Sequence, residues 1–156
     1  MNDIITRLNA TINENLQRIS HLTEAEFTTV PAPGKWSKKQ IIGHLVDSAH
    51  NNLRRFIVGQ YQPNVKIIYD QNFWNEVNHY QDMPTADLLR LWVMMNERIA
   101  HVLSAMPLAH YTHTVDTGQT EISLKTIHWL AGDYVLHMQH HINQMFPGTY
   151  NIAYPQ

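Results

Sequence analysis

Three histidines in this chain have the types and spacing needed to hold a reactive metal ion. His137 and His141 are four residues apart in a segment with helical periodicity, so their imidazoles lie on one helix face. His44 lies far earlier, on a second expected helix. Two imidazoles from one helix and a third from a facing helix supply three nitrogens and leave coordination positions open, as in catalytic sites. The sequence therefore suggests a reactive metal centre rather than a closed structural one.

Helical phase separates these histidines from their neighbours on the last expected helix. At about 100° per residue, His141 falls within the apolar stripe and His137 falls at its edge, whereas His140 points away. Two neutral imidazoles buried together each need a donor and an acceptor, a requirement that a metal ion satisfies. The stripe itself consists of Ile127, Leu130, Ala131, Tyr134, Met138 and Met145.

The expected helix that carries His44 has a polar seam beside its apolar stripe. His44, Ser48 and Arg55 lie along this seam. Asp47 and His50 are expected on the opposite side, facing solvent.

A plainer interpretation stays open, because the chain contains 11 histidines and some pair spaced by four arises by chance. A histidine beside an apolar face is more often a hydrogen-bonded core residue than a metal ligand. Asp133 lies one turn before His137 and either orients a ligand or is a solvated surface carboxylate.

The sequence lacks the residues that other common metal-binding and nucleophile motifs require. A zinc-protease helix needs a glutamate directly after its first histidine, where this chain has Met138. A ferritin-like di-iron bundle needs Glu-x-x-His on two helices, and only the segment 76–79 matches. There is no glycine-rich phosphate loop and no Gly-x-Ser-x-Gly elbow.

Composition narrows the compartment and the partners. The chain has 156 residues, a net charge of -2 and no cysteine, which excludes disulfides, a protein thiolate and cysteine-bound zinc. This charge balance does not predict nucleic-acid or anionic-membrane partners. With no apolar run of about 20 residues and no signal-peptide pattern, the expected location is cytoplasmic.

Apolar periodicity predicts an all-α protein, a single four-helix-bundle domain over residues 1–156. Ser37 and Gln40 fit a capping box, and Ser123 is expected to cap the last helix. A turn or short hairpin is expected over 108–122, and a short helix over 71–78 within a long aromatic loop. The main helices are expected at 3–22, 37–59, 85–106 and 123–145.

The segments Gly34-Lys35-Trp36-Ser37, Gly43-His44-Leu45-Val46-Asp47-Ser48 and Asp133-Tyr134-Val135-x-His137-x3-His141 together resemble the DinB-like superfamily, in its YfiT-type branch of metal-dependent hydrolases. The resemblance spans nearly the whole chain. It implies an up-down-down-up bundle, a homodimer, and a divalent metal, nickel or zinc, held by His44, His137 and His141.

The same resemblance implies an activity, because several relatives use the metal to activate a low-molecular-weight thiol, as bacillithiol S-transferases or mycothiol-dependent isomerases. A three-histidine site stays positively charged and lowers the pKa of a bound thiol or water. Arg55 is then a candidate to hold a carboxylate of the thiol cosubstrate, or simply forms a surface ion pair. The aromatic loop (Tyr69, Phe73, Trp74) either walls a pocket or caps the bundle. Metal-dependent hydrolysis and a non-catalytic ligand-binding bundle remain the alternatives.

Overall fold

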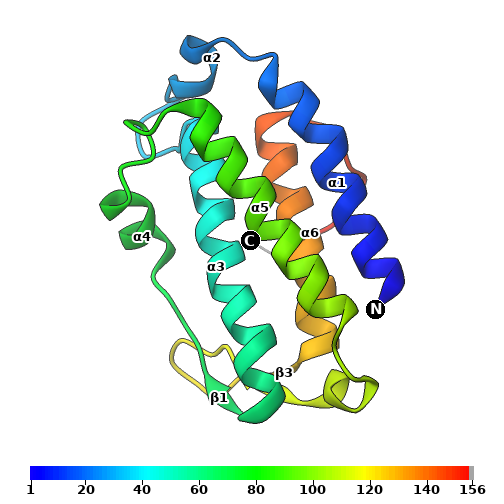
Figure 1. Ribbon diagram of the computed structural model, residues 1–156. Coiled ribbons are helices and arrows are strands. Elements are labelled where there is room, and N and C mark those ends of the chain that lie inside the picture. Colours follow the sequence, from blue (N-terminus) through cyan, green and yellow to red (C-terminus); the bar gives the residue numbers. More distant parts are fainter. Residues whose placement is uncertain (155–156) are drawn as a thin grey trace.

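Four long helices form a bundle in the computed structural model, which describes residues 1–154 (Figure 1). Helices α1 and α6 run in one direction, and α3 and α5 run in the opposite direction. Helix α3 packs against α5 and α6, and α1 packs against the same two helices. The up-down-down-up order expected from the family resemblance is therefore confirmed. The bounds are Asn2–Ser20 for α1, Lys38–Tyr61 for α3, Thr85–Ser104 for α5 and Ile127–Met145 for α6.

The apolar stripes of these helices meet in one core. On α1 the buried positions recur every three or four residues, as the periodicity predicts. The largest fully buried side chains include Trp92, Tyr134, Phe27 and Phe56. Burial of a side chain of this size contributes roughly 1.5 to 3 kcal/mol to stability. The shared core therefore stabilises the packing of α3 against α6, the two helices that carry the site described below.

Short elements connect the long helices. The expected capping box is present at α3, where Ser37 Oγ accepts from Gln40 N and the Gln40 side chain accepts from Ser37 N. The short helix expected at 71–78 is α4, Gln71–Val77, and Asp70 caps it. The remaining short helices are α2, Glu24–Thr28, and the 3₁₀ helix η1, Leu108–Thr112.

A small three-stranded sheet closes one end of the bundle. The expected hairpin is present, as β2 (Thr114–Asp116) pairs antiparallel with β3 (Leu124–Thr126). The sequence did not indicate β1 (Val65–Lys66), which pairs parallel to β2 in the register Val65 to Val115.

The start of α6 differs from the sequence prediction. Ser123 does not cap this helix, because the residues after it extend as β3 to pair with β2. Thr126 is the cap, and its hydroxyl accepts from Trp129 N. The Asp116 carboxylate instead accepts from the backbone N–H groups of Gly118 and Ser123, which closes the hairpin turn.

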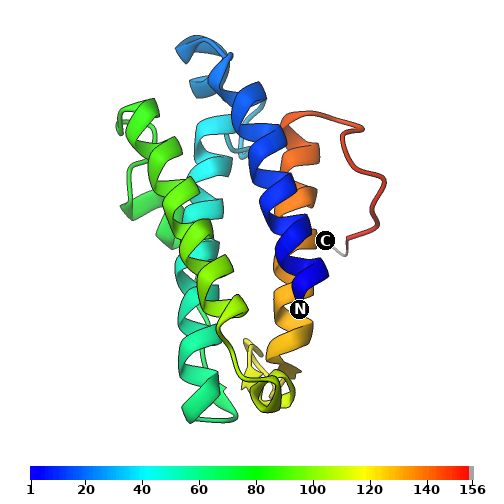
Figure 2. The same cartoon turned by 45° about the vertical axis from the view of Figure 1, so that its right-hand side comes forward.

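The segment after α6 turns back along the bundle (Figure 2). Gly148 has a φ of +80°, a left-handed conformation that suits glycine at this turn. Tyr150 anchors the segment through two hydrogen bonds of 2.8 Å with Asn143, and its hydroxyl accepts from Asn15 at 2.6 Å. Tyr154 is thereby brought beside α6. Over residues 1–154, no helix is long and apolar enough to cross a membrane.

Candidate metal centre

The three predicted histidines converge where α3 and α6 pack together. His137 Nε2 lies 3.2 Å from His44 Nε2 and 3.1 Å from His141 Nε2. One ligand atom from each histidine lies within 4.8 Å of the other two. The spacing of four places His137 and His141 on the same face of α6, and His44 faces them from α3. The structure thus unites side chains that lie 93 residues apart in the chain.

These distances fit nitrogen ligands of a single divalent ion. Ligand nitrogens about 2.0 to 2.1 Å from one ion lie roughly 3.0 to 3.4 Å apart in six- or four-coordinate geometry. The two Nε2–Nε2 distances fall within this range. Two of the three nitrogen pairs therefore have the spacing of ligands to one ion, and the third pair lies within 4.8 Å.

Gln144 fixes the proton position on His141. His141 Nδ1 faces Gln144 Oε1 at 2.8 Å, and an amide oxygen only accepts, so Nδ1 carries the proton. The Gln144 amide also donates from its Nε2 to His140 Nε2 at 3.0 Å, and this second hydrogen bond sets the orientation of the amide. His141 Nε2 consequently presents a lone pair to the centre of the cluster. Outer hydrogen bonds of this kind are typical of metal-binding histidines.

A chain of hydrogen bonds runs along α3 to the imidazole of His137. Arg55 donates to Asn52 Oδ1 at 3.3 Å, Asn52 donates to Ser48 Oγ at 3.3 Å, and Ser48 Oγ lies 3.4 Å from His137 Nδ1. Tyr69 lies near Ser48, and burial raises the pKa of this tyrosine. The polar seam expected on this helix is thus a connected network that orients His137.

Burial keeps all three imidazoles neutral. Desolvation lowers the pKa of His44 to about 3 and that of His141 to about 4. It also lowers the pKa of His137 well below its usual value, and the neighbouring histidines add to this effect. His44 is fully buried, and its Nδ1 has no hydrogen-bond partner among the described residues. Neutral nitrogens are the form that binds a metal.

Aromatic rings cover the cluster on two sides. The Trp36 ring lies 4.9 Å from that of His44 and 6.4 Å from that of His141, between centroids. The Tyr154 ring lies 5.8 Å from that of His137. Trp36 directly precedes the helix cap Ser37, in the motif Gly34-Lys35-Trp36-Ser37. Its place over the cluster gives that motif a physical role, because the ring excludes water from His44.

Asp47 is not on a solvent-facing side, as the helical phase had suggested. It is 2% exposed, because the segment after α4 covers this face of α3. Its Oδ1 accepts from Tyr80 Oη at 2.5 Å and from Asn78 Nδ2 at 3.0 Å. Burial raises the pKa of Asp47 to about 6, although both hydrogen bonds lower it. A Cβ at Gly43 would lie 2.1 Å from the Tyr80 ring, so this glycine makes room for the ring.

The other candidates lie outside the cluster. His50 is exposed and packs near Trp74, as the prediction that it faces solvent requires. His140 touches Gln144 and the Tyr154 ring. Asp133 accepts a 3.4 Å hydrogen bond from Tyr154, and among residues 1–154 it has no hydrogen bond to a histidine of the cluster. Asp133 therefore borders the cluster through Tyr154 rather than orienting a ligand directly.

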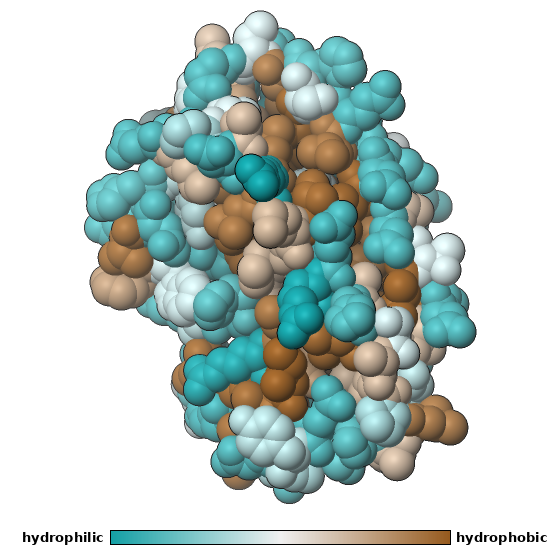
Figure 3. All heavy atoms as spheres, viewed as in Figure 1, coloured by the Kyte–Doolittle hydropathy of each residue, from teal (hydrophilic) through white to brown (hydrophobic). Residues whose placement is uncertain are grey.

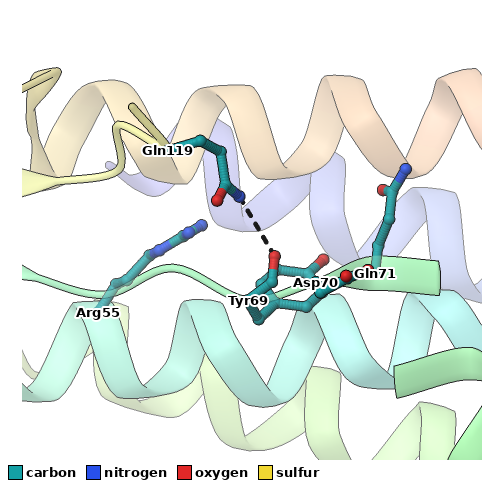
Figure 4. Close-up of a pocket in the computed structure, with 5 residues that line it drawn as sticks. All are labelled: Arg55, Tyr69, Asp70, Gln71 and Gln119. Carbon is teal, nitrogen blue, oxygen red and sulfur yellow. Dashed lines mark hydrogen bonds between the residues drawn. The ribbon is translucent and has the colours of Figure 1, made fainter. Parts of the chain in front are cut away.

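Two cavities meet at Arg55. One, of about 480 Å³, is lined by Arg55, Tyr69, Asp70, Gln71 and Gln119 (Figure 4). There Gln119 points from the β2–β3 turn toward the segment that carries Tyr69, and donates to the Tyr69 carbonyl at 3.3 Å. The second cavity, of about 450 Å³, lies between the β2–β3 hairpin, α6 and the C-terminal segment. Both volumes are in the range of small-molecule sites.

The sequence profile of the DinB superfamily matches residues 7–145, which include all three histidines. The chain belongs to the DinB superfamily.

The chain is similar to a Bacillus cereus protein in sequence and to two solved structures in fold. A protein of Bacillus cereus (strain AH820), named provisionally as a metal-dependent hydrolase, is 26% identical over 133 residues, covering 83% of this chain and 73% of its own. YfiT of Bacillus subtilis, described as a probable metal-dependent hydrolase with an unusual four-helix bundle topology, superposes with a TM-score of 0.84 at 23% identity. That match covers 92% of this chain and 82% of YfiT. A mycothiol-dependent maleylpyruvate isomerase superposes with a TM-score of 0.70 at 14% identity, covering 90% and 57%.

Several residues around the centre of this DinB-superfamily chain escaped the sequence analysis. Gln144 sits one turn from His141, and its position on the same helix face is the only signal that could have singled it out. Tyr154 carries no such signal, because only the folded C-terminal segment brings it to α6. Tyr69 was expected either to wall a pocket or to cap the bundle, and it lines the cavity of Figure 4.

Proposed function

We propose that this protein is a divalent-metal enzyme whose metal ligands are the Nε2 atoms of His44, His137 and His141. The observation that carries the proposal is the convergence of three neutral imidazoles with Nε2 separations of 3.1 and 3.2 Å. The lone pair on His141 points at a neighbouring ring nitrogen, and one cation satisfies all three lone pairs together. Nickel and zinc both suit imidazole ligands.

Each part of the chain around the centre has a distinct task in this proposal. Gln144 and Ser48 keep two ligands oriented, and Trp36 excludes water from one side. A bound divalent ion supplies Lewis acidity that shifts the pKa of a thiol or water ligand toward neutrality. No protein cysteine and no general base among the ligands is then required.

We further propose that the ligand activated is a low-molecular-weight thiol, which the enzyme transfers to small electrophiles. A mycothiol-dependent isomerase with the same fold supports this choice. Arg55 supports it as well, because three of its five N–H donors bind Ile67 O and Asn52, which leaves two for a ligand. Among the described residues no carboxylate forms an ion pair with Arg55. A carboxylate of the thiol fits this position.

Metal-dependent hydrolysis is the second candidate, with water in place of the thiol. The provisional names of the relatives as metal-dependent hydrolases favour it. The two reactions share one centre and differ in whether turnover needs a thiol.

Elemental analysis tests the metal site directly. Protein purified without a nickel column should carry about one divalent ion per chain. The double variant His137→Ala, His141→Ala should carry none, and His50→Ala, an exposed histidine, should keep the wild-type content. Equal metal content in the double variant and the wild type would refute the site. Turnover of small electrophiles only with added thiol indicates a transferase, and turnover of esters or amides without thiol indicates a hydrolase.

We also propose that the protein is a homodimer, as its family resemblance implies. Apolar side chains form a broken strip along the face that α5 presents in Figure 3. Met94 on this helix is 55% exposed. Light scattering should give twice the mass of the chain, and Met94→Glu should shift the protein toward the monomer. A monomeric wild type at micromolar concentration contradicts this proposal.

A further inference from the structure

The two cavities that share Arg55 differ in chemical character. Around the cavity of Figure 4, the other lining residues are Tyr69 and three polar or acidic residues. The second cavity has an apolar wall built from Trp129, Leu130 and Leu136. A hydrophilic molecule fits the first, and a molecule with an apolar body fits the second.

A different tyrosine lines each cavity. Tyr69 lines the polar cavity and lies near Ser48, whose Oγ is 3.4 Å from His137 Nδ1. Tyr154 lines the apolar cavity, and its ring lies 5.8 Å from that of His137. The two cavities therefore offer separate sites for the two substrates of a transfer reaction.

The apolar cavity also has an excess of positive charge. Arg55 and Lys125 both line it, and Asp133 is the only carboxylate that residues 1–154 contribute to it. Neither cation forms an ion pair within residues 1–154. Lys125 Nζ lies 4.8 Å above the Trp129 ring, so the ammonium group sits over the aromatic wall. Trp129 is 48% exposed, so part of its ring is open to a molecule in the cavity.

We propose that the apolar cavity binds an aromatic carboxylate, with the ring against Trp129 and the carboxylate near Lys125. The binding site is independent of the proposed function. Only the role of the aromatic carboxylate as the second substrate rests on that function. An aromatic acid that carries an electrophilic carbon would meet the activated thiol at the cluster. The binding site itself requires no metal.

Binding of 1-naphthoate to the metal-free protein tests the site by calorimetry. We expect one site per chain, with binding weakened about tenfold in Lys125→Gln, since a charged hydrogen-bonding partner is lost. Trp129→Ala should weaken it by a similar factor, and Trp129→Tyr should keep most of the affinity. The neutral isostere 1-naphthamide should bind about tenfold more weakly than 1-naphthoate.

Matched controls separate this site from general effects. Lys35→Gln removes an exposed lysine elsewhere, and Leu108→Ala trims a side chain that is 78% exposed, so both should leave binding unchanged. Each variant is used only if its thermal midpoint matches the wild type. No binding of 1-naphthoate at millimolar concentration, equal binding by Lys125→Gln, Trp129→Ala and wild type, or equal affinity for the amide would overturn the inference.

Elemental analysis distinguishes failure of this inference from failure of the proposed function. If the protein binds 1-naphthoate and holds no metal, the aromatic-carboxylate site is supported and the metal-enzyme proposal is refuted. If the protein holds metal and does not bind 1-naphthoate, the metal-enzyme proposal is supported and the aromatic-carboxylate site is refuted.

Discussion

Acid should destabilise the metal-free protein through its buried imidazoles. The pKa of His44 is about 3 in the folded protein, against about 6.5 in an unfolded chain. Between these values the unfolded state binds more protons than the folded state, so stability is full above pH 6.5 and falls as the pH falls. At pH 5 the loss is about 2 kcal/mol for one such imidazole. His141, with a pKa of about 4, contributes about the same again.

The size of this effect is set mainly by the unfolded chain, because both folded pKa values lie below pH 5. Asp47 acts in the opposite direction. Its pKa of about 6 in the folded protein lies above its ordinary value, so protonation at pH 5 stabilises the fold by roughly 1.4 kcal/mol. A measurement on the wild type alone would therefore mix the two effects.

Comparison with His44→Gln isolates the contribution of one imidazole. Urea unfolding with a chelator present, at pH 8 and pH 5, gives the loss of unfolding free energy for each protein. We expect this loss to be smaller by about 2 kcal/mol in the variant, since glutamine does not titrate. Asp47 affects both proteins equally and cancels. An identical pH dependence of the two proteins would show that His44 is not held neutral by burial, and the reasoning would fail.

Three further predictions follow from single contacts. Gln144→Leu should weaken zinc affinity by about 10- to 100-fold, measured by competition with a chromogenic chelator; unchanged affinity would mean that the amide does not orient its neighbouring ligand. Gly43→Ala should destabilise the fold by about 1 to 3 kcal/mol in urea, although alanine is the better helix former, and in a Tyr80→Ala background this penalty should vanish. Thr126→Ala should cost about 1 kcal/mol as the loss of a helix cap, whereas Ser123→Ala should leave the unfolding midpoint unchanged, and the reverse order would restore Ser123 as the cap.

Helical periodicity was sufficient to predict the four long helices, because each buries one continuous apolar stripe. It also separated His137 and His141 from His140, since a fixed angle per residue decides which side chains face a neighbouring helix. Phase alone left a chance histidine pair as an alternative, and the resemblance to the DinB-like superfamily implied the full set of His44, His137 and His141.

Features made by segments distant in sequence could not be read in the same way. Asp47 looked solvent-facing because helical phase describes one helix, and the cover over it comes from Asn78 and Tyr80. Strand β1 has two residues, too few for an alternating pattern, and exists through its partner β2. Thr126 replaced Ser123 as the cap because strand pairing delays the helix by three residues.

The distance in sequence between the ligands has a consequence for folding. An ion bound to His44 and His137 would tie together positions 93 residues apart, and thus close a loop that includes α5 and the whole sheet. In the chain-entropy description, a covalent link closing a loop of this length is worth about 4 to 5 kcal/mol. A chain without cysteine would in this way acquire a removable counterpart of a disulfide, whose strength is set by the supply of metal rather than by the redox state.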